Sequence, residues 1–292
     1  MPSKTRIIEF DALGTHWWIT FFGDIELGLQ DDILQIVDKF EMDYSRFKET
    51  SYVSILNKKK KIKNASDELL DLLKISLDFY NKTNGIFNIS VGSQLEKLGY
   101  GTNISSSSQL SNSLNEDILI KQSTIELHNN ISIDLGGIGK GYLIDILTNY
   151  LTAKTKDDFI INGGGDLYVK SKKHIKIELE HPTNPDESIG YLRLKNQALA
   201  VSSPVKRQWI NTSTNSKQHH IIDPKTGQSR SRYLCSFVVA KNATNADVVG
   251  TVLLLANKIQ RRKFQREFEC EYLLVNDDLT SIISNNFEAD LY

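Results

Sequence analysis

The chain has 292 residues, of which 40% are hydrophobic and 24% charged, a composition typical of a folded globular protein. Its 35 Lys and Arg residues nearly balance its 36 Asp and Glu residues, so the chain has no net positive charge that would attract nucleic acid or an anionic membrane. The 2 cysteines lack metal-ligand spacing and favour a reducing compartment. The N-terminal residues show no secretory signal, and no apolar run approaches the roughly 20 residues of a membrane span. We therefore expect a cytoplasmic location and no membrane span.

The first third of the chain is expected to form two strands followed by two amphipathic helices. β-branched and aromatic residues on both sides of Gly14 predict a hairpin over 5–10 and 15–22. Apolar residues at helical spacing then predict helices over 31–44 and 66–83.

The middle of the chain is expected to be rich in strands. The tract 102–115, dominated by Ser and Asn, predicts a loop or short surface helix between two subdomains. Strands are predicted over 118–121, 124–127, 131–134, 158–161 and 175–180, with one helix over 140–152. No internal repeat is present, so the pattern indicates a mixed α+β protein with much antiparallel sheet.

Two glycine-rich segments offer room for a ligand. The first, residues 134–142, lies between a predicted strand and helix, where free N–H groups and Lys140 would favour a phosphate. Its spacing fits neither a Walker A loop nor a dinucleotide-binding fingerprint, so a tight turn is the alternative. The second, residues 162–166, follows an apolar strand and is explained nearly as well by a simple turn.

Two further clusters carry groups suited to catalysis. His220 precedes a turn formed by residues 223–227 and is a candidate general base, or else a histidine satisfied by the turn's backbone. Asp247 and Thr251 are four residues apart on one helix face and would offer Mg²⁺ two hard oxygen ligands. Compensation of the helix dipole is the alternative for Asp247, which is predicted to lie in the first turn of a helix opening at Ala246.

Taken together and in order, these clusters resemble the ApbE family, the FAD:protein FMN transferases. The resemblance spans nearly the whole chain and rests on eight blocks: residues 10–15, 45–47 with 54–57, 85–88, 134–145, 164–166, 181–182, 220–227 and 246–251.

The resemblance implies a single flavin transferase domain over 5–290. It would be an α+β fold of mixed, largely antiparallel sheets with packed helices, in two intimately associated subdomains with FAD in the cleft between them. Mg²⁺ would be bound by Asp247, Thr251 and a backbone carbonyl at Gly139. Residues expected to contact FAD are Leu13, Gly14, Asn57, Gly137, Gly139, Gly164, Gly165, Asp166, Ser203, His220 and Ile221.

The chemistry that the resemblance implies is attack by a Thr or Ser hydroxyl of an acceptor flavoprotein on the FMN phosphorus of FAD, with AMP leaving. Positioning and charge neutralisation supply most of the catalysis in such transfers. His220 would accept the hydroxyl proton and Lys140 would add positive charge, although packing at the helix start is an alternative for Lys140. The acceptor is expected to be a flavoprotein subunit of a respiratory or reductase system with a short Thr/Ser-containing motif.

Several positions depart from the usual family pattern. They are Leu13 for Met, Asn88 for Asp, Gly139 for Ala, and 202–204, which read Ser-Ser-Pro where Thr-Ser-Gly is usual. Pro204 lacks an N–H and has a fixed φ, which can alter contacts to flavin or acceptor. Two alternatives therefore stay open: an FAD pyrophosphatase that yields FMN and AMP, and a non-catalytic FAD-binding protein.

Overall fold

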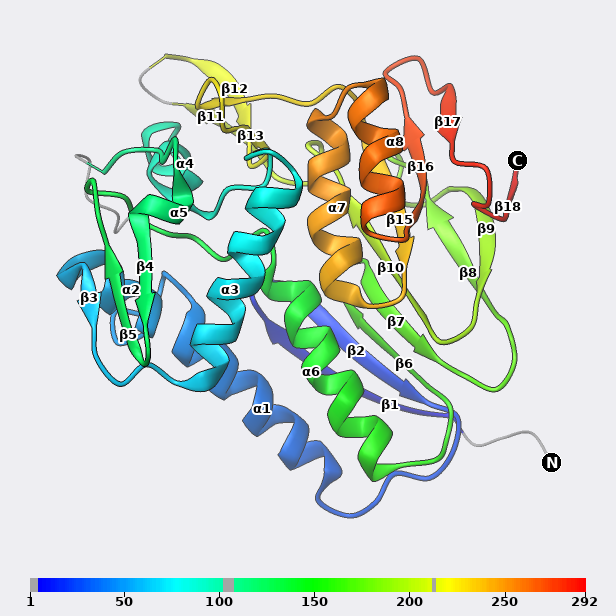
Figure 1. The fold of residues 1–292 in the computed structure, drawn as a ribbon. Coiled ribbons are helices and arrows are strands. Elements are labelled where there is room, and N and C mark those ends of the chain that lie inside the picture. The colour runs from blue at the N-terminus through cyan, green and yellow to red at the C-terminus, as the bar shows by residue number, and fades with distance from the viewer. Residues whose placement is uncertain (1–4, 102–107, 212–213) are drawn as a thin grey trace.

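An antiparallel sheet of eight strands runs through the centre of the computed structural model, which describes residues 5–101, 108–211 and 214–292 (Figure 1). The strands lie side by side in the order in which they occur along the chain. They are β1 (Arg6–Ala12), β2 (Thr15–Phe21), β6 (Phe159–Gly163), β7 (Asp166–Lys170), β10 (Gln197–Ser202), β15 (Cys235–Ala240), β16 (Glu271–Val275) and β17 (Ser281–Ile283).

Helices cover one face of this sheet, with α6 and α7 next to each other and α1 beside α6 (Figure 1). Leu29, Ile33, Val37 and Phe40 form one buried stripe of α1 at helical spacing. Most residues of α7 are buried, and its second half is almost entirely apolar, as expected for a helix packed on several sides. The helices are α1 (Leu29–Tyr44), α2 (Tyr52–Lys59), α3 (Asp67–Lys82), η1 (Ile89–Val91), α4 (Gly92–Lys97), α5 (Leu114–Asp117), α6 (Gly139–Lys154), α7 (Ala243–Leu255) and α8 (Lys258–Glu267).

A second, smaller core lies on the opposite face of the sheet. There a three-stranded sheet of β8 (Ile175–Glu180), β9 (Ser188–Leu194) and β18 (Ala289–Leu291) packs its apolar side chains on β10, β15 and β16. Alternate residues of a strand point to opposite faces, so Leu199 belongs to this core while Ala198 and Ala200 belong to the helix-covered core.

The remaining strands form three small antiparallel units. They are β3 (Lys61–Ile62) with β5 (Thr124–Leu127) and β4 (Ile118–Lys121), β11 (Gln208–Asn211) with β12 (Ser216–His219), and β13 (Ile222–Asp223) with β14 (Gln228–Ser229). No helix of the described residues is long and apolar enough to cross a membrane.

The expected α+β class, with mixed and largely antiparallel sheets and packed helices, is confirmed. The predicted hairpin and the helices over 31–44, 66–83 and 140–152 are present, with ends shifted by a few residues at most. The tract 102–115 lies partly outside the described residues, and α5 begins at its end. The single domain over 5–290, divided into two subdomains, stays a prediction.

Two local predictions are wrong. The helix expected to open at Ala246 begins at Ala243, so Asp247 lies beyond its first turn. The segment 131–134 is no strand and, among the described residues, forms a single bridge, from Ile131 to Gln109. Side chains of α2 and its C-cap replace the neighbouring strand, because Asn57 bonds both the N–H and the C=O of Ile133, and Lys60 Nζ donates to the Ile131 carbonyl at 2.6 Å.

Candidate active site

A buried cluster of opposite charges lies where α6, β7 and α7 meet. Lys140, in the first turn of α6, contacts the Asp166 carboxylate at the start of β7, and its Nζ lies 3.7 Å from Asp247 Oδ1 on α7. Asp166 Oδ1 also accepts a hydrogen bond from the Val201 N–H at 3.0 Å. Burial lowers the pKa of Lys140, while the Asp247 carboxylate acts in the opposite direction. Two carboxylates thus face one ammonium group in a site largely shielded from water.

Glycine at position 141 allows α6 and α7 to approach closely. A Cβ there would lie 2.4 Å from the backbone oxygen of Ala243 and 2.9 Å from the Asp247 Cβ. The close approach places the Gly141 N–H 2.9 Å from Asp247 Oδ2, near the free N–H groups that begin α6. The orientation of the Asp247 carboxylate therefore depends on a residue without a side chain.

Asp145 holds the N-terminus of α7 against α6. Its carboxylate, on α6, accepts hydrogen bonds from the N–H groups of Ala243 and Thr244 at 2.8 and 2.9 Å, and from the Thr244 hydroxyl. A carboxylate at a helix N-terminus is favourable because the N–H groups there lack helical partners. Burial raises the pKa of Asp145.

The surroundings of Asp247 suit a hard divalent cation. Thr251 lies one turn further along α7, and its hydroxyl is 3.5 Å from the Ser202 hydroxyl of β10. A carboxylate and hydroxyls are ligands that Mg²⁺ accepts, with water and substrate phosphate completing its shell. Asp166 and Asp247 outnumber Lys140 in the cluster, and the positive charges of Arg207 and Lys206 also act on Lys140. This donor set fits a hard divalent cation, and the assignment of Asp247, Thr251 and Gly139 as metal ligands stays a prediction.

His220 directly follows β12 and is half-buried, with its ring Nδ1 shielded from solvent. Its Nδ1 has no hydrogen-bond partner among the described residues, so the turn's backbone does not satisfy that atom. Burial lowers the pKa of His220 to about 4, and the positive charge of Arg207 adds to the effect. The ring is therefore neutral at pH 7 and able to accept a proton. Among the described residues, no hydrogen bond links His220 to the Lys140 cluster.

Two glycine turns lie together beside this region. Leu13 and Gly14 both have positive φ in the β1–β2 turn, next to a cavity of about 370 Å³ that Glu41 also lines. The Gly164 N–H donates to the His16 carbonyl at 3.1 Å, and a Cβ at Gly164 would lie 2.4 Å from Thr15 Oγ1. The predicted flavin contacts at 13–14 and 164–165 therefore belong to adjoining turns.

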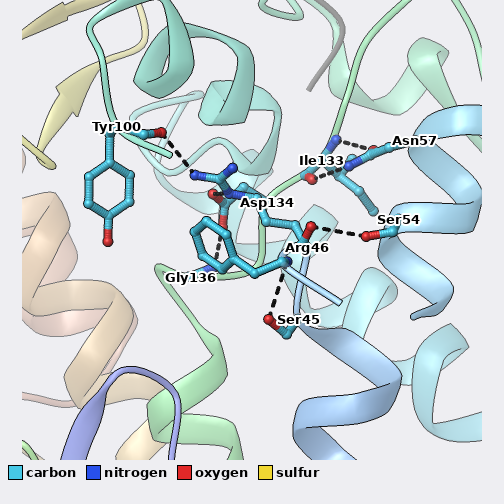
Figure 2. A network of polar contacts seen from close by, with 9 residues as sticks. Ser45, Arg46, Ser54, Asn57, Tyr100, Ile133, Asp134 and Gly136 are labelled. Atoms are coloured by element: carbon cyan, nitrogen blue, oxygen red, sulfur yellow. Dashed lines mark hydrogen bonds and ion pairs between the residues drawn. The ribbon is translucent and has the colours of Figure 1, made fainter. Parts of the chain in front are cut away.

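Asn57 and Asp134 belong to a separate hydrogen-bond network (Figure 2). Arg46 Nε donates to Asp134 Oδ2 at 2.6 Å, and Gly136 N–H donates to Asp134 Oδ1 at 2.6 Å. Arg46 also lies against Tyr100 and Phe47, with its guanidinium carbon 4.2 Å from the centre of the Phe47 ring. This network holds the glycine-rich loop that leads into α6. Gly137 lies in that loop, where a Cβ would be 3.5 Å from the Phe87 ring.

The departure at 202–204 is accommodated by local hydrogen bonds. Ser203 Oγ donates to the Leu234 carbonyl at 2.9 Å and accepts from the Val205 N–H at 3.1 Å. Pro204 is buried between them.

Ile221 is also buried, and its N–H contacts the His219 ring. Ser203 and Ile221 thus have structural partners here, and their predicted contacts to FAD stay predictions.

The structure brings the distant residues Lys140, Asp166 and Asp247 into one cluster. Sequence reasoning missed the positioning contacts of Arg46, Gly141 and Asp145. All three lie in the family-like blocks 45–47 and 134–145, and membership of these blocks is the sequence signal that could have identified them.

Comparison with known proteins supports the resemblance. The model of the ApbE family matches residues 13–274. A Buchnera aphidicola (subsp. Schizaphis graminum) protein named FAD:protein FMN transferase is 26% identical over 274 residues, covering 86% of this chain and 80% of that protein. The Escherichia coli K12 protein of the same name is 22% identical over 323 residues, covering 99% and 92% of the two chains.

Solved structures show the same fold. The crystal structure of the ApbE protein from Thermotoga maritima matches with a TM-score of 0.84 and 24% identity, covering 97% of this chain and 98% of that one. Flavin transferase ApbE from Vibrio cholerae matches with a TM-score of 0.79 and 20% identity, covering 98% and 99%. With a family match over most of its length, the chain belongs to the ApbE family and is a transferase.

Proposed function

We propose that this chain transfers FMN from FAD to a Thr or Ser hydroxyl of an acceptor flavoprotein and releases AMP, in a reaction that requires Mg²⁺. The observation that carries the proposal is the buried cluster of Lys140, Asp166 and Asp247, with the Thr251 hydroxyl one helical turn from Asp247. The names of the relatives support the same reaction.

In the proposed reaction the acceptor oxygen forms a bond to the FMN phosphorus, and the bond from that phosphorus to the oxygen bridging to AMP breaks. AMP leaves with the bridging oxygen and its electron pair. Asp247 and Thr251 would hold the metal, and Mg²⁺ would offset charge on the pyrophosphate and on the leaving AMP.

The chain's own residues would orient the metal-binding carboxylate and neutralise negative charge on the substrate. Gly141 and Lys140 fix the direction of the Asp247 carboxylate, and Lys140 supplies positive charge in a site of low dielectric. His220, neutral at pH 7, would accept the proton of the acceptor hydroxyl at a ring nitrogen. The β1–β2 turn, which lines an open cavity, and the adjoining β6–β7 turn would lie against the flavin nucleotide. A cytoplasmic location and an acceptor from a respiratory or reductase system belong to the same proposal.

The test is to incubate the chain with FAD, Mg²⁺ and an acceptor domain and to measure the acceptor's intact mass. We expect an added FMN that is absent when Mg²⁺ is chelated. Asp247→Asn and Thr251→Val should lower the rate by about 10³-fold, since each removes a metal ligand. Thr251→Ser is the matched control and should stay within about tenfold of wild type, because it keeps the hydroxyl.

Other outcomes of this assay would favour one of the two alternative functions or refute the metal assignment. AMP and free FMN without a modified acceptor would indicate a pyrophosphatase. Bound, intact FAD without turnover would indicate a flavin-binding protein. Unchanged rates in Asp247→Asn would show that the metal assignment is wrong.

A further inference from the structure

A second cavity lies between α8 and β17, the strand at one end of the main sheet, and none of the predicted site residues lines it. Its volume is about 480 Å³, within the range of small-molecule sites. In Figure 1, α8 and β17 lie near the C-terminal end of the chain. The cavity therefore lies outside the transfer site described above.

The cavity wall is strongly cationic. Lys258, Arg261, Arg262 and Arg266 line it, and no carboxylate is among its lining residues. None of these four forms an ion pair within the described residues. Glu271, beside the cavity, is already held by hydrogen bonds from Ser284, Gln265 and Asn286. In a chain with a formal net charge of −1, this is a local concentration of unpaired positive charge.

Arg261 distinguishes this wall from a solvated basic surface. Only 7% of the residue is exposed, and its Nε has no hydrogen-bond partner among the described residues. The guanidinium carbon lies 5.4 Å from the centre of the Tyr233 ring, a favourable cation–π contact. Buried donors without a partner are rare in proteins, and a ligand or ion is a common explanation. A guanidinium group matches the geometry of phosphate oxygens.

We propose that this cavity is a binding site for a small phosphate-bearing molecule. Arg261 is the buried anchor for the phosphate, and Arg262 and Lys258 add positive charge at the mouth. Ile282, which packs against the helix-covered core, provides an apolar part of the wall for the remainder of the ligand. The site is independent of the proposed FMN transfer, since it shares no residue with the transfer cluster.

The test uses inorganic pyrophosphate as the probe, without Mg²⁺ and at about 0.15 M salt, so that weak surface attraction is screened. Binding is measured by calorimetry, and the site is located by backbone amide shifts in NMR. Arg262→Gln removes a charge that lines the cavity. Lys263→Gln is the matched control, because Lys263 is the next residue of α8, is exposed, and does not line the cavity. Arg261→Gln is added after circular dichroism has verified its fold.

We expect saturable binding, with amide shifts confined to α8 and residues 281–285. Arg262→Gln should weaken binding about tenfold, whereas Lys263→Gln should change it by less than about twofold. FMN transfer by Arg262→Gln should equal that of wild type. Absence of saturable binding, equal losses in both variants, or shifts centred on Lys140 would overturn the proposal.

Discussion

The two faces of β10 and β15 are built from side chains of different size. Toward α7 the strands present small groups, including Ala198, Ala200 and Ser236, and the Ser236 hydroxyl donates to the Gly250 carbonyl at 2.8 Å. Toward the second core they present Leu199 and Phe237. Both faces are buried, so hydrophobicity alone does not explain the difference.

The small residues on this face allow α7 to pack close to the sheet, whereas large residues would bury more apolar area. A Cβ at Gly250 would lie 2.8 Å from Ser202 Oγ, which shows how closely α7 packs on β10. Gly141 permits the same closeness between α6 and α7. We infer that the helix-covered face holds Asp247 and Thr251 in position, whereas the opposite face contributes mainly to stability. The comparison predicts different consequences for substitutions on the two faces.

The largest effect is expected from Gly141→Ala. The new Cβ would meet backbone of α7, which cannot move aside as a side chain can, so unfolding free energy should fall by about 2 kcal/mol or more. Displacement of Asp247 should also lower FMN transfer by about 10²-fold in the folded protein. Urea denaturation and the acceptor mass assay measure the two effects.

Gly139→Ala is the control for this substitution. A Cβ at Gly139 would meet nothing closer than Phe40 Cε1 at 3.9 Å, so the stability should change by less than about 1 kcal/mol. Equal losses in the two variants would show that interhelical distance is not the cause.

Leu273→Ala, on the opposite face, is expected to affect stability and to have a much smaller effect on FMN transfer than Gly141→Ala. Leu273 is fully buried in the second core, so its truncation should cost about 2–5 kcal/mol of stability. FMN transfer should remain within about twofold of wild type at a temperature where the variant is folded, because the substitution is not on the α7 face. A transfer rate as low as that of Gly141→Ala would remove the distinction between the two faces.

The smallest effect concerns pH. Because burial lowers the pKa of His220 from 6.5 to about 4, the unfolded chain binds a proton at a higher pH than the folded chain does. The contribution of His220 to stability is thus present above pH 6.5 and is lost as pH falls toward 4. Between pH 7 and pH 5 the loss should be roughly 1–2 kcal/mol. His220→Gln should abolish this part of the pH dependence in urea titrations, and an unchanged profile would assign it to other groups.

The sequence predicted the features that depend on local patterns. Turn chemistry at Gly14 and the buried stripe from Leu29 to Phe40 act within one or two elements, so the hairpin and α1 were predictable. The strand expected at 131–134 failed because side chains of α2 and its C-cap, distant in sequence, satisfy its backbone. β-propensity alone does not reveal such a replacement.

The site was only partly predictable for the same reason. Resemblance to the family singled out Lys140, Asp166 and Asp247, but not the contacts among them. The Arg46–Asp134 pair joins residues 88 positions apart, and no local pattern indicates such a pairing. Roles for these residues and the division into subdomains remain predictions.

The strand order of the main sheet has a consequence for how the chain folds during synthesis. Each strand pairs with strands that neighbour it in chain order, so a growing sheet can add strands at one edge as they leave the ribosome. Lys140 and Asp166 come together once β7 has joined, while Asp247 arrives only with α7, after β15. The two acidic halves of the site are therefore assembled at different times. A nascent chain lacking α7 would contain Lys140 and Asp166 but lack Asp247 and Thr251, the two side chains proposed to bind Mg²⁺.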